Sequence, residues 1–205
     1  MTIQTMTKEQ LISRIQPVRV EGDTSGVVTG LAYDSRQVVP GSAFFALRGT
    51  HVDGHEFIDA AIAAGASIVI MEEERELPGV VAVTVNDARR ALAEASALYF
   101  GSPSDRMRVI GVTGTNGKTS TAELTRQLWQ LAGHRSASIG TLGVTTGYDR
   151  VSPRDGTGGL TTPDVVTFLA TMAGLAREGI SHAAFEASSH GLDQHRIEGL
   201  PVRAG

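Results

Sequence analysis

The sequence predicts an α/β fold, because short apolar runs alternate along the chain with amphipathic stretches of helical spacing. Residues 66–71 and 80–85 are apolar runs of the length of buried strands. Residues 56–64 and 87–99 repeat apolar side chains at the spacing of one helical face. The 24 glycines are a third indication, since they favour many turns and backbone-lined loops over a helical bundle.

The two helices predicted in the first half have recognisable ends. Gly65 follows the first helix as a C-terminal cap, and Asp87 can cap the amino end of the second. The residues expected on their apolar sides are Phe57, Ile58, Ala61 and Ile62 in the first helix and Leu92, Ala95 and Tyr99 in the second.

A domain boundary is predicted at residues 101–104, Gly-Ser-Pro-Ser, which are small, polar and helix-breaking. This divides the chain into residues 1–102 and residues 103–205. The elements predicted next are a strand over 107–112, a tight loop over 114–118, a helix over 119–132 and a strand over 135–140. We expect that helix to bury its three leucines, Leu124, Leu128 and Leu131.

The last third of the chain predicts a hairpin or mobile loop, a helix and a strand. Residues 143–160 are rich in glycine, threonine and charge, which favours the exposed hairpin or loop. Thr162 can cap the helix that Pro163 opens. The apolar side of this helix is expected to comprise Val165, Phe168, Leu169, Met172 and Leu175. The strand over 180–185 ends at Glu186.

The composition excludes several classes of protein. A net charge of −4 gives no general attraction to nucleic acid or to an anionic membrane. The chain has no cysteine, so it has no disulfide or thiolate metal site, which suits the cytoplasm. We identify no signal peptide and no apolar run near the roughly 20 residues that cross a bilayer. We expect a monomer, and the sequence alone leaves the oligomeric state open.

The strongest motif is Gly114-Thr115-Asn116-Gly117-Lys118-Thr119, between a predicted strand and a predicted helix. Such a loop points backbone N–H groups at phosphate oxygens, and the helix dipole adds partial positive charge. Lys118 can then reach the terminal phosphates of ATP, and the Thr119 hydroxyl can bind Mg²⁺. The general pattern G-x-x-x-x-G-K-[ST] is not met, because its first glycine is replaced by Val112. The alternative is a glycine-rich turn with a surface lysine.

A carboxylate supports the phosphate-binding interpretation. Glu186 ends an apolar strand, where open α/β sheets bind ligands, and it can hold Mg²⁺ directly or through water. Without the phosphate loop, Glu186 would be interpreted as a solvated residue at the end of a strand. The histidines do not suggest zinc, because the spacing of His51, His55, His190 and His195 matches no common zinc pattern.

Three parts of the sequence resemble the Mur ligase family. Residues 111–120 resemble the family's ATP loop. Residues 33–36, Tyr-Asp-Ser-Arg, with the blocks that follow as far as His55, look like the domain that grips the uridine nucleotide. Residues 186–196, Glu-Ala-Ser-Ser-His-Gly-Leu-Asp-Gln-His-Arg, resemble the branch that adds the third amino acid of the muramoyl peptide, as do residues 160–163.

The resemblance implies an α/β domain that binds a uridine nucleotide, followed by a truncated P-loop ATPase-type α/β domain. It implies an ATP-dependent ligase that phosphorylates the D-glutamyl carboxylate of UDP-N-acetylmuramoyl-L-alanyl-D-glutamate. The amine of a diamino acid, 2,6-diaminopimelate in most such enzymes, would then displace phosphate. Complete ligases of this branch are much longer, so we expect the C-terminal ligase domain to be absent and little turnover from these residues alone.

The resemblance also assigns roles to individual residues, with Lys118 and Glu186 as the catalytic pair. ATP would be bound by Gly114, Thr115, Asn116, Gly117, Lys118, Thr119 and Ser120, and Mg²⁺ by Thr119 and Glu186. The uridine diphosphate end would contact Tyr33, Ser35, Thr50, His51 and Val52. The muramoyl peptide would contact Thr161, Thr162, Ser188, Gln194 and Arg196. Arginine suits this role because it grips carboxylates and phosphates with paired hydrogen bonds.

Simpler interpretations remain for some of these residues and for the whole chain. Thr162 can act only as a helix cap, Ser35 can cap a turn with Asp34, and Tyr33 can be a half-buried strand residue. The chain can also be a related amide ligase with another substrate. A third alternative is a non-catalytic module that binds a UDP-sugar without any dependence on ATP.

Overall fold

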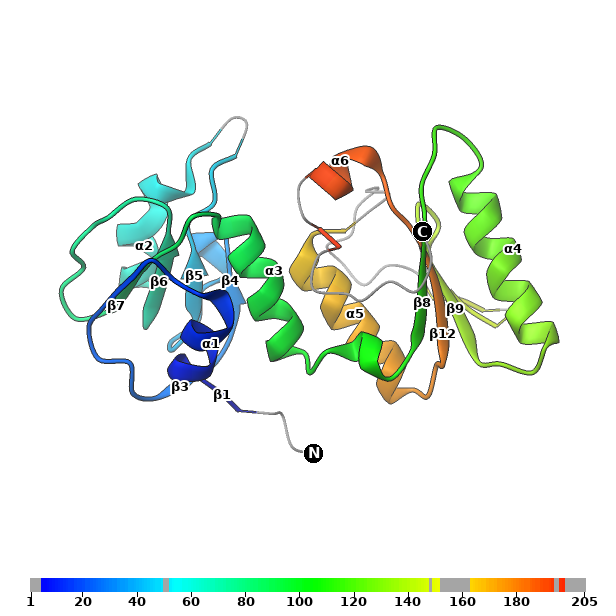
Figure 1. Cartoon of the computed structure of the whole chain (residues 1–205), viewed down its shortest axis with the longest axis horizontal. Helices are drawn as coiled ribbons and strands as arrows, with labels where there is room; N and C mark the ends of the chain where they lie inside the picture. The colour runs from blue at the N-terminus through cyan, green and yellow to red at the C-terminus, as the bar shows by residue number, and fades with distance from the viewer. Residues whose placement is uncertain (1–4, 50–51, 148, 152–162, 194–195, 198–205) are drawn as a thin grey trace. The chain divides into compact units, whose positions relative to one another are not determined.

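The computed structural model describes residues 5–49, 52–147, 149–151, 163–193 and 196–197 (Figure 1). The chain divides into two compact units, Met1–Tyr99 and Phe100–Gly205. Each unit is built on a five-stranded sheet with helices packed on it, so the predicted α/β fold class is confirmed.

The sheet of the first unit has the order β2-β7-β6-β5-β4. Its strands are β2 (Arg19–Glu21), β4 (Leu31–Ala32), β5 (Ala43–Phe45), β6 (Ile68–Met71) and β7 (Val81–Thr84). β4 to β7 run parallel, and β2 is antiparallel to β7. A separate antiparallel pair joins β1 (Met6–Thr7) to β3 (Val27–Val28). All four residues of β6 are buried, as expected for a strand covered on both faces.

Two of the three helices of the first unit form where their caps predict, and the helix at Lys8–Ile15 is not among the predicted elements. The three helices are α1 (Lys8–Ile15), α2 (Ile58–Ala63) and α3 (Ala88–Tyr99), with short 3-10 turns at Ser35–Gln37 and Gly54–Phe57. Asp87 accepts a hydrogen bond of 2.9 Å from the backbone N of Arg90, which confirms it as a cap. Gly65 has a φ of 104° after α2, the conformation expected of a C-terminal cap.

The sheet of the second unit has the order β11-β10-β9-β12-β8. Its strands are β8 (Arg108–Val112), β9 (Ser136–Gly140), β10 (Gly143–Thr146), β11 (Asp149–Val151) and β12 (His182–Glu186). β8, β12 and β9 are parallel, whereas β10 and β11 form an antiparallel hairpin on β9. The hairpin expected within residues 143–160 is therefore present up to Val151, and residues 152–160 lie outside the described part.

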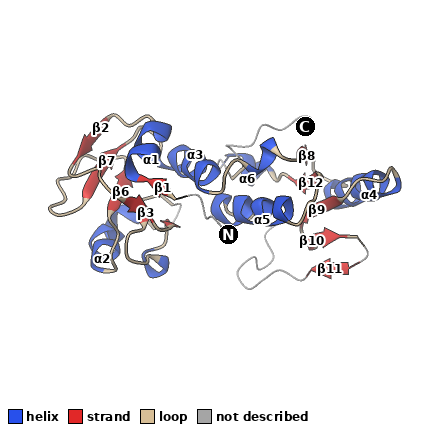
Figure 2. Cartoon of the chain, turned by 90° about the horizontal axis from the view of Figure 1, so that it is seen from below, coloured by secondary structure: helices blue, strands red, loops and turns tan. Residues whose placement is uncertain are grey.

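Helices α4 (Lys118–Leu131) and α5 (Val165–Arg177) lie on opposite faces of this sheet, as Figures 1 and 2 show. A 3-10 turn at Pro103–Asp105 and the short α6 (Ser189–Asp193) complete the unit. The predicted apolar side of α5 is confirmed, because all five residues named for it are buried. The cap is Asp164, which accepts from the backbone N of Thr167 at 3.0 Å, so the expectation that Thr162 caps this helix is wrong.

The prediction for α4 is wrong in its orientation. Leu124, Leu128 and Leu131 are 58%, 65% and 84% exposed, and the buried residues of the helix are Ala122 and Arg126. The physical reason is that the face of the sheet on which α4 packs is polar.

Among the described residues, no helix is both long and apolar enough to span a membrane.

Candidate functional site

The predicted phosphate loop lies between the end of β8 and the start of α4. Gly114 and Gly117 have φ angles of 142° and 81°, which side chains with a Cβ rarely adopt. Gly117 is the N-cap of α4, and its carbonyl accepts a bond of 2.9 Å from the backbone N of Thr121. No side chain caps this helix end. The loop thus presents the head of a 14-residue helix with the partial charge that attracts phosphate.

Lys118 folds over this loop. Its Nζ donates to the carbonyl oxygen of Gly114 at 2.6 Å, which keeps the ammonium group above the glycine bend. Thr119, the next residue, is half-buried in the first turn of α4. Thr115, Asn116 and Ser120 are exposed. A cation, a hydroxyl and exposed backbone are thus gathered at one end of the helix.

Glu186 lies at the same edge of the sheet, since β12 and β8 are parallel neighbours. It pairs in register with Val112, and the backbone N of Ala187 donates to the Val112 carbonyl at 2.9 Å. Only 3% of Glu186 is exposed. Its carboxylate accepts from the backbone N of Thr141 at 2.9 Å and from the Thr141 hydroxyl at 3.1 Å. The strand ends therefore bring Glu186 and the phosphate loop to one edge.

Gly140 and Thr141 are site residues that the sequence reasoning missed. A Cβ on Gly140 would lie 2.0 Å from Oε1 of Glu186, so only glycine leaves room for the carboxylate here. The signal was available in the sequence, because Gly140 ends the strand that is predicted after the helix at the phosphate loop. The carboxyl ends of parallel strands share one edge.

The other residues predicted in the second unit are only partly described. The Ser188 hydroxyl accepts from the backbone N of Gly191 at 3.0 Å and so stabilises α6, which follows β12. The backbone N of Arg196 donates to the Gly191 carbonyl at 2.9 Å, which ends the same short segment. Thr161, Thr162 and Gln194 lie outside the described residues. Within the described part of the chain, no three His, Cys, Asp or Glu side chains are grouped as metal ligands.

In the first unit, three of the predicted uridine contacts, Tyr33, Ser35 and Val52, follow the carboxyl ends of neighbouring parallel strands. Tyr33 directly follows β4, and Ser35 begins a 3-10 turn that Asp34 caps. Val52 is 54% exposed in a turn that follows the neighbouring strand, β5. Thr50 and His51 lie outside the described residues.

Comparison with known proteins agrees with this arrangement. Residues 27–104 match the family described as "Mur ligase family, catalytic domain", and residues 112–205 match the "Mur ligase middle domain". The chain belongs to the Mur ligase family. Mur ligases are ATP-dependent acid–amino-acid ligases, and this chain spans their N-terminal and middle domains.

Two curated relatives of this Mur ligase chain carry the same name, UDP-N-acetylmuramoyl-L-alanyl-D-glutamate–2,6-diaminopimelate ligase. The protein from Bradyrhizobium diazoefficiens is 51% identical over 179 residues, which are 87% of this chain and 35% of the relative. The protein from Zymomonas mobilis is 50% identical over 178 residues, with the same coverage. This chain thus spans about a third of their length.

Solved structures of Mur ligases share the fold of this chain. One, a UDP-N-acetylmuramoyl-L-alanyl-D-glutamate–2,6-diaminopimelate ligase, is 29% identical, has a TM-score of 0.81, and is matched over 98% of this chain and 40% of its own. Another, the D-alanyl-D-alanyl-adding ligase of Acinetobacter baumannii, is 22% identical with a TM-score of 0.61, which supports the fold alone.

Proposed function

We propose that this chain forms the N-terminal and middle part of the cytoplasmic ligase that adds 2,6-diaminopimelate to UDP-N-acetylmuramoyl-L-alanyl-D-glutamate. The observation that carries the proposal is the shared sheet edge, where the strand before the Lys118–Thr119 loop ends in register with Glu186. Identities of 50–51% to proteins of that name support this substrate over other muramoyl peptides.

ATP is proposed to bind at the head of α4. The backbone of residues 114–120 would surround the phosphates, and Lys118 would leave the Gly114 carbonyl to neutralise the terminal phosphate oxygens. In this role the chain orients the γ-phosphoryl group toward the D-glutamyl carboxylate. Phosphoryl transfer depends mainly on such positioning and on charge neutralisation.

Magnesium is proposed to be held by Thr119 and Glu186. A hydroxyl and a carboxylate are the hard oxygen donors that Mg²⁺ prefers, and Gly140 leaves the space that the carboxylate occupies. When bound, the ion would neutralise charge on the phosphate oxygens. The Thr141 hydrogen bonds would hold Glu186 in one orientation for this purpose.

The uridine end and the peptide end of the muramoyl nucleotide are proposed to have separate contacts. Tyr33, Ser35 and the turn at residues 50–52 would hold its uridine diphosphate end. Ser188 and Arg196, together with Thr161, Thr162 and Gln194, would hold its peptide. An arginine is suited to the peptide's carboxylates because its guanidinium donates two parallel hydrogen bonds.

The test is ligand binding to the 205-residue chain, measured by titration calorimetry. The wild-type chain is expected to bind Mg²⁺-ATP, and Lys118→Ala should weaken this affinity about tenfold to a hundredfold, because a charge-assisted contact to phosphate is lost. Lys8→Ala is the matched control, since Lys8 is the only other lysine in the chain and lies on α1. An affinity that Lys118→Ala leaves unchanged would refute the phosphate-loop assignment.

The substrate is tested with the same chain and a panel of nucleotides. UDP-N-acetylmuramoyl-L-alanyl-D-glutamate is expected to bind more tightly than UDP-N-acetylmuramate, because only the former offers the peptide carboxylates. Equal affinities for the two would remove the peptide-binding role. UDP-sugar binding without any binding of ATP would favour the non-catalytic module instead.

A further inference from the structure

Leu142 is a leucine that the fold fixes at the carboxyl edge of the second sheet. Gly140 of β9 pairs with Gly143 of β10, so Thr141 and Leu142 form the short turn between these two strands. Gly143 has a φ of 85° where the turn ends. The backbone N and the hydroxyl of Thr141 both donate to the carboxylate of Glu186. Leu142 therefore belongs to a turn that is tied to the proposed magnesium ligand.

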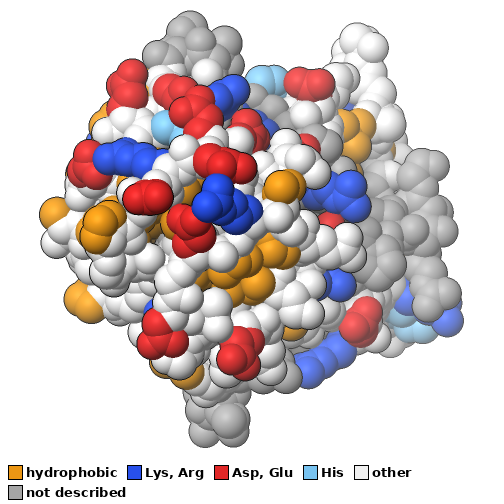
Figure 3. All heavy atoms as spheres, turned by 60° about the vertical axis from the view of Figure 1, so that its left-hand side comes forward, with side chains coloured by type: hydrophobic (Ala, Val, Ile, Leu, Met, Phe, Trp, Pro, Cys, Tyr) orange, Lys and Arg blue, Asp and Glu red, His pale blue; other side chains and the backbone are white. Residues whose placement is uncertain are grey.

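The turn leaves Leu142 at the surface, 48% exposed. Figure 3 shows hydrophobic side chains at the surface of the first unit as well, so exposure alone does not mark a site. Leu142 is distinguished by its place in the chain, directly after a residue that holds the Glu186 carboxylate with two hydrogen bonds. An apolar side chain fixed beside a carboxylate suits a ligand whose apolar and charged parts lie close together.

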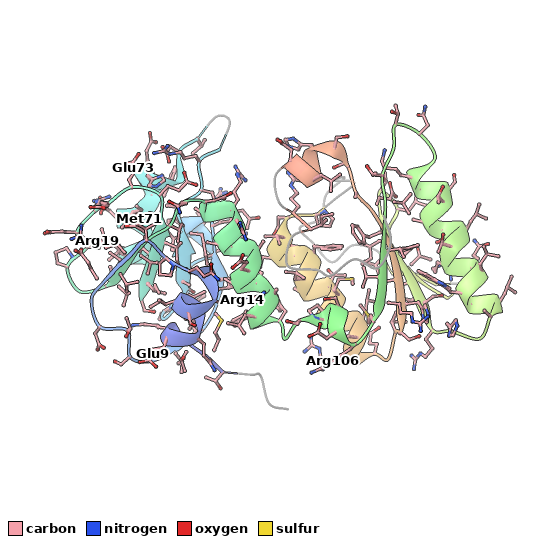
Figure 4. All side chains as sticks on the ribbon, in the orientation of Figure 1. Glu9, Arg14, Arg19, Met71, Glu73 and Arg106 are labelled. Atoms are coloured by element: carbon pink, nitrogen blue, oxygen red, sulfur yellow. The ribbon has the colours of Figure 1, made fainter. Side chains whose placement is uncertain are left out.

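The order of the strands places Leu142 on one side of Glu186 and the phosphate loop on the other. β12, which ends at Glu186, lies between β8 and β9 (Figure 2). Arg106, just before β8, is labelled at the lower end of the second unit in Figure 4, so the carboxyl ends of these parallel strands form its upper end. Neighbouring strands lie about 4.8 Å apart, so the ends of β8 and β9 are roughly 10 Å apart.

This order determines the side from which the phosphoryl acceptor approaches. In the proposed reaction, the phosphates of ATP lie on the loop after β8, and the terminal phosphate lies toward Glu186 at the end of β12. The attacking and leaving oxygens of a phosphoryl transfer are roughly in line, so the acceptor approaches from the side opposite the leaving ADP. That side is the end of β9, where the turn with Leu142 lies.

We propose that Leu142 is a specificity-determining residue that packs against the methylene groups of the D-glutamyl side chain whose carboxylate is phosphorylated. This rests on the proposed function, which places ATP on the loop and Mg²⁺ at Glu186. The methylene groups are the apolar part of the substrate next to the reacting carboxylate, so a leucine beside Glu186 binds them without adding charge. The contact also displaces water from the carboxylate that becomes an acyl phosphate.

The test compares two nucleotides that differ only in the D-glutamyl residue, UDP-N-acetylmuramoyl-L-alanyl-D-glutamate and UDP-N-acetylmuramoyl-L-alanine. Their dissociation constants for the 205-residue chain are measured by titration calorimetry, with Mg²⁺ and an ATP analogue that cannot be hydrolysed. Leu142→Ala should weaken binding of the glutamyl nucleotide about fivefold, because the apolar contact of part of one leucine side chain is lost. The same substitution should leave the affinity for the alanyl nucleotide unchanged.

Two further substitutions separate this contact from a general loss of structure. Leu142→Met should keep the wild-type affinity for both nucleotides, because methionine supplies a similar apolar area. Leu131→Ala is the matched control, since Leu131 is 84% exposed at the end of α4 that is distant from the phosphate loop. It should leave both affinities unchanged. The alanyl nucleotide also reports whether each variant is folded, because its binding does not need the glutamyl contact.

The outcomes distinguish this role from the proposed function. If Leu142→Ala binds the glutamyl nucleotide as tightly as wild type, or loses the same factor for both nucleotides, the role of Leu142 is overturned and the proposed function stands. A wild-type chain that binds neither nucleotide would overturn both. If Leu142→Ala does not fold, Leu142→Gln decides in the same way, because it keeps the size of the side chain, makes its end polar and should weaken only the glutamyl nucleotide.

Discussion

Helices α4 and α5 cover opposite faces of one sheet, yet they bury opposite kinds of side chain. α5 buries Phe168 and Leu169, which are 1% and 0% exposed. α4 buries Arg126, at 3% exposed, and turns Leu128 outward at 65%. Both helices carry apolar residues at helical spacing, so the pattern within a helix does not decide which side it buries.

The strands beneath the helices explain the difference. Side chains alternate along a strand, so one face of β9 presents Ser136 and Ser138, and the other presents Ala137 and Ile139. Arg126 donates to Glu123, and Glu123 accepts from the Ser138 hydroxyl at 2.7 Å, so α4 packs on the polar face. The other face is apolar, as the Phe pair between α5 and β12 shows.

That aromatic pair gives the largest expected effect. Phe168 of α5 lies edge-on to Phe185 of β12, with ring centroids 5.1 Å apart. Phe168→Ala should lower the free energy of unfolding by about 3–5 kcal/mol, because it leaves a cavity in the apolar layer. Trp129, the only tryptophan, lies in α4 and reports unfolding of this unit by fluorescence in urea.

The control for Phe168→Ala is Phe57→Ala. Phe57 is 40% exposed and belongs to the first unit, so its removal should leave the Trp129 transition unchanged. If Phe168→Ala lowers the free energy of unfolding by less than about 1 kcal/mol, the layer between α5 and the sheet is not the packed core described above.

The polar layer under α4 predicts a smaller, pH-dependent effect. Hydrogen bonds from Arg126, followed in importance by those from Gln127 and Ser138, lower the pKa of Glu123 from 4.5 to about 2. A carboxyl whose pKa is lower in the folded state stabilises the fold above its unfolded pKa, and this stability is lost as the pH falls toward 2. Glu123 should contribute on the order of 3 kcal/mol at pH 7 and about half of that at pH 3.

Glu123→Gln tests this contribution against wild type, with urea unfolding followed by Trp129 fluorescence at pH 7 and pH 3. The difference in the free energy of unfolding between wild type and Glu123→Gln should be smaller at pH 3 than at pH 7. Glu94→Gln is the matched control, because Glu94 pairs with Arg90 at 3.1 Å on a helix of the other unit. A difference that stays constant with pH would show that Glu123 does not act through its charge.

Much of the fold and part of the site could be predicted from the sequence, because they depend on local patterns. Asp87 and Gly65 mark helix ends by their own chemistry, and β6 is apolar throughout because helices cover both its faces. The phosphate loop and Glu186 could be predicted since strand ends and glycine bends are local features. The phosphate loop and Glu186 lie at the same edge of the sheet because β8 and β12 are parallel neighbours.

What the sequence reasoning missed depends on contacts between distant segments. The orientation of α4 follows from the serines of β9, which come after the helix in the chain. The space at Gly140 becomes meaningful only when the Glu186 carboxylate, 46 residues later, is placed over it. The alternation Ser-Ala-Ser-Ile-Gly over residues 136–140 did contain the missing information, since it marks one polar and one apolar face.

The smallest expected effect tests the exposed side of α4. Leu128→Ala should change the free energy of unfolding by less than about 0.5 kcal/mol, because a 65% exposed side chain loses little burial and alanine favours a helix. Its matched partner is Leu169→Ala on α5. Because Leu169 is fully buried, this substitution should lower the free energy of unfolding by about 3 kcal/mol. Both are measured by Trp129 fluorescence in urea at pH 7. Equal losses would mean that the two helices bury equivalent faces, and the contrast between a polar and an apolar layer would have to be abandoned.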